Sequence, residues 1–213
     1  MTTIPKRTHI DRPWRIHELT GGFDLEDVWA LPTPGGPDDF PRLVALLANP
    51  GRAGGDRARA ARMLWATRMW IGALLGWDGE DQGIGARVPS LRGRMPADLR
   101  AAPTGPPLAR PEFRPLYLLD DEYAAEIANR TVHGVLHVGW APDADGGGFH
   151  GEMAVYVKPA GLLGHAYLAA IRPFRRLVVY PAMLRHIGER WRAAERDRPR
   201  AAYAGARSSA RSS

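Results

Sequence analysis

Four short runs of β-type residues follow one another between residues 113 and 159, and they constrain the fold more than any other feature. The runs are FRPLYLLDDE, YAAEIANR, TVHGVLHVGW and GEMAVYVKP, bounded by turn residues. Parallel neighbours need connections of a dozen or more residues, so the short links favour an antiparallel meander. The longest link, APDADGGGFH, has the Asp and Gly content of a hairpin loop. The sequence therefore predicts an antiparallel sheet here.

An apolar pattern with the period of an α-helix follows the last run. Its members recur at steps near 3.6 residues, and they are Tyr167, Ile171, Phe174, Val178, Leu184, Ile187 and Trp191. Pro173 and Pro181 lie inside the pattern and should kink or segment the helix. We therefore expect one long, segmented helix near the C-terminal end.

The first fifty residues predict one strand and two short helices. PWRIHEL (13–19) alternates loosely and predicts a strand that begins after Pro13. Asp24 is a good N-cap for a helix that Pro32 would stop. FPRLVALLANPG predicts a second short helix with Pro41 in its first turn.

Residues 56–77 predict a first long helix with a broad apolar stripe. Trp65, Trp70 and Trp77 fall within 13 residues, which is an unusual density. Such tryptophans either fill a core or interface, or line a ligand pocket, since pockets are mostly apolar and aromatic. Residues 78–112 are rich in Gly, Pro, Asp and Arg, and predict loop with a short helix at MPADLR.

The composition and the absence of known motifs exclude several classes of functional site. The 213 residues include no cysteine, which excludes disulfides, thiolate metal sites and cysteine nucleophiles, and which suits a reducing cytoplasm. The most hydrophobic window, 63–77, contains Arg68 and is shorter than the roughly 20 residues of a spanning helix. The N-terminus has no apolar core of a secretory signal, and no Walker loop, Rossmann fingerprint, GxSxG or HExxH motif occurs. We expect a cytoplasmic protein with neither cofactor nor metal.

Positive charge gathers at the C-terminal end. Residues 172–213 carry 11 arginines and three acids, a net charge of +8, whereas residues 1–171 carry −2. We expect a single domain over residues 1–192 and a basic, disordered tail over residues 193–213. This end could bind nucleic acid or an anionic membrane. Only two of the 29 basic residues are lysines, so a general arginine bias and a solvated tail explain the same pattern.

The order of elements resembles the START/SRPBCC superfamily, which includes lipid-transfer domains and polyketide cyclases. FDLEDVWAL is similar to the opening of its first small helix. MAVYVKPAGLLGHAYLAAIRPFRRLVVYPAMLRHI is similar to the last strand, glycine-bearing turn and C-terminal helix of a bacterial branch. The likeness covers about residues 10–192 and departs from the superfamily at 56–112. It implies an α+β helix-grip fold: a curved antiparallel sheet around a long C-terminal helix, often with an apolar cavity. It assigns no reaction, so no catalytic residue carries over.

Three functions are compatible with these features. The first is binding of an apolar or amphipathic small molecule between sheet and C-terminal helix, in a pocket whose candidate lining residues are Trp65, Trp70, Trp140, Tyr167 and Phe174. The second is an enzyme of the cyclase, dehydratase or isomerase type that works by general acid–base catalysis in the same cavity. The third is a non-enzymatic interaction module that uses the basic end. A homo-oligomer is compatible with all three.

His133 and His137 are the main catalytic candidates, together with Glu126. Four residues on a strand span about 13 Å, too far for both rings to reach one zinc ion at about 2 Å, so we expect no shared metal. Every second residue of this strand belongs to a more apolar set, which should turn towards the core. The set is Val132, Gly134, Leu136, Val138 and Trp140. The histidines then lie on the outer face or under a neighbouring element. If the mixed face turns inward instead, the histidines line the cavity as acid–base groups.

Arg172, Arg175 and Arg176 lie near the start of the predicted C-terminal helix. They are candidates for holding a ligand carboxylate or phosphate, because guanidinium groups bind such anions through paired hydrogen bonds. A solvated polar face explains the same cluster.

Overall fold

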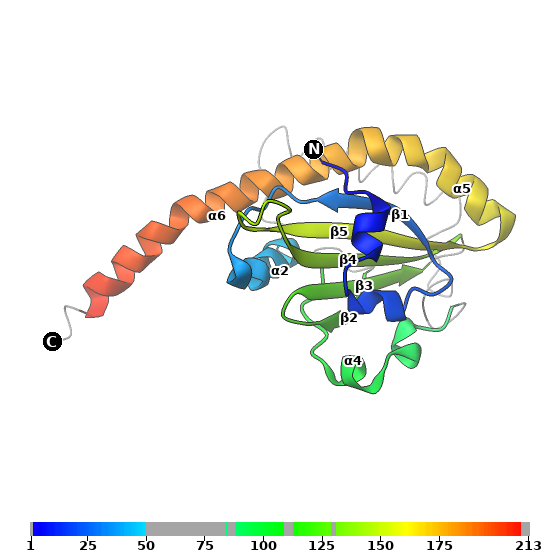
Figure 1. Cartoon of the computed structure of the whole chain (residues 1–213), viewed down its shortest axis with the longest axis horizontal. Helices are drawn as coiled ribbons and strands as arrows, with labels where there is room; N and C mark the ends of the chain where they lie inside the picture. The colour runs from blue at the N-terminus through cyan, green and yellow to red at the C-terminus, as the bar shows by residue number, and fades with distance from the viewer. Residues whose placement is uncertain (1, 50–83, 85–87, 109–112, 129–130, 210–213) are drawn as a thin grey trace.

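Five strands form one antiparallel sheet in the order β1-β5-β4-β3-β2 (Figure 1). The computed structural model describes residues 2–49, 84, 88–108, 113–128 and 131–209, so the predicted helix at 56–77, with Trp65 and Trp70, lies outside the described residues. Strands β2 (Arg114–Leu118), β3 (Glu122–Ala128), β4 (Val132–Pro142) and β5 (Phe149–Pro159) are the predicted meander, which is confirmed.

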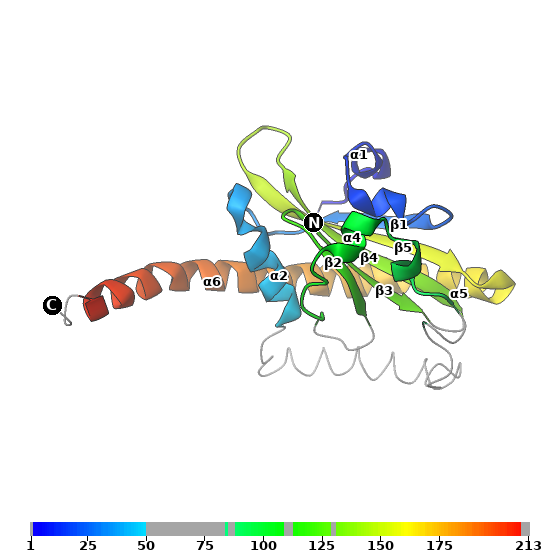
Figure 2. The same cartoon turned by 90° about the horizontal axis from the view of Figure 1, so that it is seen from below.

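A long, bent helix crosses one face of this sheet (Figures 1 and 2). It consists of α5 (Gly161–Phe174), a π-helical turn η5 (Arg175–Val179) and α6 (Tyr180–Ser209). Pro181 offers no N–H to the carbonyl one turn earlier, which explains why the helix widens just before it. The predicted segmented helix is confirmed. Helix α6 continues past residue 192, where we expected a disordered tail to begin.

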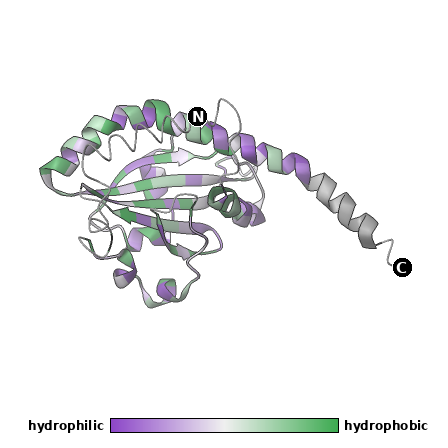
Figure 3. Ribbon diagram, turned by 180° about the vertical axis from the view of Figure 1, so that it is seen from behind, coloured by the Kyte–Doolittle hydropathy of each residue, from purple (hydrophilic) through white to green (hydrophobic). Residues whose placement is uncertain are grey.

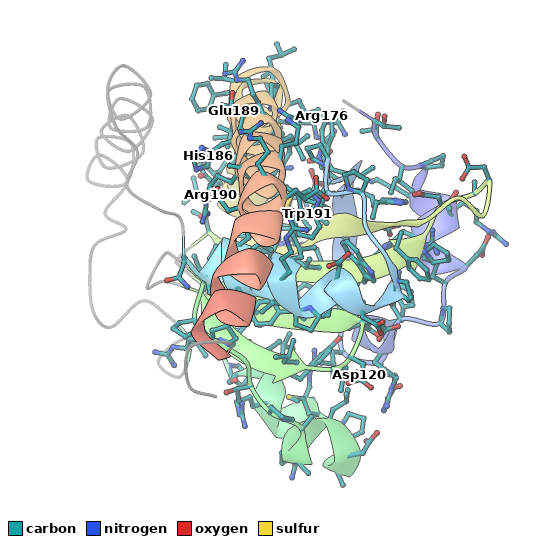
Figure 4. All side chains as sticks on the ribbon, turned by 90° about the vertical axis from the view of Figure 1, so that its left-hand side faces the viewer. Asp120, Arg176, His186, Glu189, Arg190 and Trp191 are labelled. Carbon is teal, nitrogen blue, oxygen red and sulfur yellow. The ribbon has the colours of Figure 1, made fainter. Side chains whose placement is uncertain are left out.

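The two faces of the sheet carry different cores. Towards α6, an aromatic and aliphatic cluster includes Trp29, Trp140, Tyr180, Leu184 and Trp191. Figure 4 shows Trp191 on the side of α6 that faces the sheet and Glu189 on the other side. The opposite face is covered by residues 2–23, which we call the N-terminal segment, and by residues 88–102, whose short helices are η4 (Leu91–Arg94) and α4 (Ala97–Ala101).

The N-terminal segment contains α1 (Lys6–Ile10) and a 3₁₀-helix, η1 (Arg15–Glu18), so the predicted strand at 13–19 is wrong. Its loose alternation instead places Trp14, Ile16 and Leu19 against the sheet, with the 3₁₀ turn between them.

The predicted helix from Asp24 is also wrong, because these residues form β1 (Asp24–Ala30), which pairs with β5. The likeness of FDLEDVWAL to a superfamily helix therefore fails at this point. A 3₁₀ turn, η2 (Pro37–Asp39), then leads into α2 (Phe40–Ala48), which confirms the second predicted helix, and α4 confirms the short helix at MPADLR to within a few residues.

Candidate functional site beneath the N-terminal segment

Six ionisable side chains lie together on the sheet face opposite α6, each at most 5% exposed. We call them the polar layer: His9, Glu122, Glu126, His133, His137 and Glu152. Strands β3, β4 and β5 supply five of them, and α1 supplies the sixth. His133 and His137 thus lie under a neighbouring element, while the apolar set of β4 faces the long helix, as the alternation predicts.

Glu122 holds the beginning of η1 on the sheet. Its carboxylate accepts hydrogen bonds from the backbone N–H groups of Arg15 (2.7 Å) and Ile16 (3.3 Å). The Tyr117 hydroxyl donates at 3.0 Å, and Nε2 of His137 lies 3.1 Å away. Burial pushes the pKa of Glu122 upward, but the donors, His137 first, more than offset it and hold the pKa below its usual value. Glu122 is therefore ionised at neutral pH.

Glu126, four residues after Glu122 on β3, accepts hydrogen bonds in a similar way. It accepts a hydrogen bond from the Leu91 N–H at 3.0 Å, where η4 begins, and from the Ser90 hydroxyl at 2.5 Å. Nε2 of His133 lies 3.1 Å from the same carboxylate. Burial raises the pKa of Glu126, but His133, Ser90 and the Leu91 amide lower it by more, so its pKa too lies below the usual value.

His137 has one bonded and one unbonded ring nitrogen. Because Nε2 faces the Glu122 carboxylate, the ring proton belongs on Nε2 and Nδ1 is left as an acceptor. Nδ1 is buried and has no hydrogen-bond partner in the described part of the chain. Burial lowers the pKa of His137, and Glu122 offsets this only in part, so the ring is neutral at pH 7.

His9 connects two residues of β5. Its Nδ1 contacts the carboxylate of Glu152, and its Nε2 lies 2.8 Å from the Tyr156 hydroxyl. That hydroxyl is also 3.3 Å from Nδ1 of His17, which keeps partial exposure to solvent. Burial, together with the neighbouring His9, lowers the pKa of His17. The result is a chain of polar contacts from the buried Glu152 carboxylate to the partly exposed residue His17, whose Nε2 is itself buried.

Five buried polar atoms around His9 have no hydrogen-bond partner among the described residues. They are Nε of Arg12, Nε1 of Trp14, Nε2 of His17, Nδ1 of His137 and Oε2 of Glu152. The rings of His137 and His17 lie 5.4 Å and 5.5 Å from the His9 ring, centroid to centroid. Nε of Arg12 and Oε2 of Glu152 face each other as an ion pair at 3.4 Å, so the atoms that lack any such contact in the described part of the chain are Nε1 of Trp14, Nε2 of His17 and Nδ1 of His137. Each buried unpaired group costs about 1–3 kcal/mol, so such groups are expected at a site that receives another polar group.

A glycine lets Trp14 reach this site. Gly139 pairs with Glu122 on one side and Glu152 on the other, so the two carboxylates flank it in one row. A Cβ at Gly139 would lie 2.8 Å from the Trp14 ring, which is closer than real Cβ atoms approach. The indole therefore lies between the two carboxylates because position 139 carries no side chain.

The three candidate arginines are paired within the chain. Arg175 bonds both Glu26 (3.1 Å) and Asp27 (2.8 Å) of β1. Arg172 bonds Glu26 at 3.2 Å, and Arg176 bonds Asp27 at 2.8 Å. A bulge in β1 between Leu25 and Asp27 lets the two successive acids reach the same side, which a regular strand would not allow. These arginines hold the long helix against β1, and anion binding by them stays a prediction.

The three aromatic candidates that the structure describes, Trp140, Tyr167 and Phe174, lie in different environments. Trp140 is buried against Phe40 and Trp191, and its indole N–H donates to the Gly36 carbonyl at 2.9 Å. Tyr167 is half-buried on α5, and Phe174 is exposed at the end of α5. The structure therefore does not gather them around the polar layer.

Sequence reasoning missed most of this site. Glu122 could have been found, because Glu122 and Glu126 repeat on one strand the four-residue spacing of His133 and His137 on the next. No local signal marks His9, which reaches the site from a separate short helix.

Within the described residues, no group of three or more His, Asp or Glu side chains has a metal-holding arrangement. The described helices include none that is long and apolar enough to span a membrane.

We predict that Glu122→Gln lowers the free energy of unfolding by about 1–3 kcal/mol for each donor that it leaves unpaired. Glu18→Gln is the matched control, since Glu18 bonds Arg15 on the same turn but at the surface, where a salt bridge contributes less than about 1 kcal/mol. Urea denaturation measures both. Equal losses in the two variants would contradict the role assigned to Glu122.

We also predict that acidification destabilises the fold in two steps. The pKa of His137 is lowered, so below its ordinary value near 6.5 the unfolded chain takes up a proton first and stability begins to fall. The lowered pKa values of Glu122, Glu126 and Glu152 give stability above about pH 4.3, and it is lost as the pH falls through their folded-state values. Urea midpoints between pH 8 and about pH 2 test both steps, and His137→Gln should flatten the upper step. A profile that is identical in the variant would refute it.

A family model described as a protein of unknown function (DUF2867) matches residues 19–182. Searches of the curated proteins and of the solved structures found no match. The matched range includes all five strands and the three arginines, whereas His9, Trp14 and His17 precede it. Because this range makes up more than half of the 213 residues, the chain belongs to the DUF2867 family.

Proposed function

We propose that the protein is an acid–base enzyme of the isomerase or dehydratase type, which acts on a small carbonyl or carboxylate compound beneath the N-terminal segment. The observation that carries this proposal is Nδ1 of His137: it is buried and has no partner among the described residues, and it belongs to a ring that Glu122 holds in one tautomer. A carboxylate that fixes a histidine and leaves the other nitrogen free is the arrangement of a general base.

The neighbouring groups suit removal of a proton from carbon beside a carbonyl. Such a step develops negative charge on the carbonyl oxygen. Nε–H of Arg12 and Nε1–H of Trp14 are donors in every protonation state, and both are buried. Nε1 of Trp14 has no partner among the described residues, and Nε of Arg12 lies 3.4 Å from Oε2 of Glu152 in an ion pair without hydrogen-bond geometry. They are the groups that would bind this oxygen, while Nδ1 of His137 accepts the proton. In a buried site, donors that are already in place stabilise the charge more than water does.

His9, Tyr156 and His17 connect the Glu152 carboxylate with the edge of the site. Tyr156 bonds His9 at 2.8 Å and approaches His17 at 3.3 Å, and His17 is partly exposed. Arg12 and His17 are the members of the site with solvent contact, so the substrate would enter beside them.

Binding of an apolar ligand under the long helix is a second candidate. Leu136 and Val155 are opposite each other in the middle of the sheet, yet both are only half-buried although the long helix crosses this face. The resemblance to helix-grip proteins supports a cavity there. Trp140, in contrast, is packed into the core further along the same strand.

Exchange of carbon-bound hydrogen for deuterium tests the proposed reaction without knowledge of the full substrate. We would incubate a panel of small oxo and hydroxy acids with the protein in D₂O and follow exchange at the carbon beside the carbonyl by NMR. We expect catalysed exchange in at least one compound, reduced about 100-fold or more by His137→Gln. Trp14→Phe should reduce it as well, because it removes an N–H donor but keeps a ring over Gly139.

His133→Gln is the matched control. His133 makes the equivalent bond to a glutamate of β3, but its other nitrogen is not among the buried atoms without a partner. The control should therefore keep the exchange activity. Absence of exchange across the panel, or equal losses in the two histidine variants, would count against the proposal.

A further inference from the structure

An apolar stripe lies along α5 and η5 on the side that faces away from the sheet. Five large side chains on this segment are exposed, among them Leu162 at 91% and Leu177 at 76%; the others are Leu163, Phe174 and Val178. On a helix with 3.6 residues per turn these positions fall on one side, together with the exposed Ala166, Ala170 and Pro173. Figure 3 shows hydrophobic residues alternating with hydrophilic ones along this part of the helix.

The other sides of this helix contact the sheet or the acidic residues of β1. Gly164 and Leu168 are buried towards the sheet, where a Cβ at Gly164 would collide with the Thr131 carbonyl oxygen. Arg172 and Arg175 bond the acids of β1. The sheet therefore fixes the orientation of the helix and keeps the stripe outward. Single exposed hydrophobic residues are common on proteins, but a contiguous row marks a contact surface.

The charge near the stripe indicates its partner. Arg172 and Arg176 keep about half of their side chains exposed beside the stripe, and the segment from residue 172 onward carries a net charge of +8. Lys158, near the end of β5, is exposed four residues before Leu162. Two copies joined along this stripe would bring like charges together, whereas an anionic surface complements them.

We propose that the α5–η5 stripe binds the surface of an anionic lipid bilayer. Leu162, Leu163 and Leu177 enter the boundary between headgroups and acyl chains, and the adjacent arginines contact the headgroups. Amphipathic helices with this division of apolar and basic faces bind bilayers in the interfacial plane, through buried apolar area and attraction to anionic lipid. This contact is independent of the acid–base chemistry proposed for the other face of the sheet.

Vesicle flotation tests the proposal on the full chain. We expect the protein to float with vesicles of phosphatidylcholine and phosphatidylglycerol, to stay unbound with phosphatidylcholine alone, and to be released by salt. The double variant Leu162→Ala, Leu163→Ala should bind at least about ten-fold more weakly, because each leucine loses apolar area in contact with lipid. Ile10→Ala is the control, since Ile10 is 53% exposed on the N-terminal segment, away from the stripe; it should bind like the wild type.

Three results would overturn the proposal. One is a protein that binds neither kind of vesicle. Another is undiminished binding by the double leucine variant, which would assign the contact to the basic residues alone. The third is a dimer in light scattering that the double variant dissociates, which would make a second copy of the chain the partner of the stripe.

Discussion

The Glu122 carboxylate organises the face of the sheet that carries the candidate site. A 3₁₀ turn as short as η1 leaves its first N–H groups without partners and is not stable alone. Glu122, at the beginning of β3, accepts two of these N–H groups, from Arg15 and Ile16. The N-terminal segment is thereby fixed over the sheet, and it brings Trp14 and His9 with it. Glu126 does the same for η4.

The same interactions determine the protonation states in the layer. A carboxylate that accepts several hydrogen bonds stays ionised even when buried, whereas a buried histidine tends to be neutral. Glu122 and His137 follow this rule, and their bond leaves a buried, unpaired Nδ1. Two properties thus arise from one contact: the N-terminal segment is anchored, and a basic nitrogen is held in a dry environment. Stability and proposed chemistry share the same residues, so variants must be interpreted against matched controls.

The sequence was informative where local pattern decides structure. Short links between β-type runs predicted the antiparallel meander, and the 3.6-residue period predicted the long helix with its interruption near Pro181. The apolar alternation on β4 predicted which face meets that helix. It placed His133 and His137 on the other face, and the structure shows that the N-terminal segment and residues 88–102 cover that face.

The sequence misled where distant residues decide. DLEDVWA has the N-cap and acidic first turn of a helix, yet it pairs with β5, and its acids bind arginines about 150 residues later. PWRIHEL has a strand-like alternation, but Glu122 stabilises a 3₁₀ turn there. Of the candidate site, His133, His137 and Glu126 were identified from the sequence. His9 and Trp14 were not, because only the folded chain brings the N-terminal segment over the sheet.

The central claim is that Glu122 holds a neutral His137 with its proton on Nε2 and with Nδ1 as a free acceptor. Side-chain ¹H–¹⁵N NMR of the histidine rings at pH 7 tests it most directly, with the His137 signals assigned by their loss in His137→Gln. The account predicts a ring protonated at Nε2 alone. A His137 ring that is protonated at Nδ1, or at both nitrogens, would contradict it.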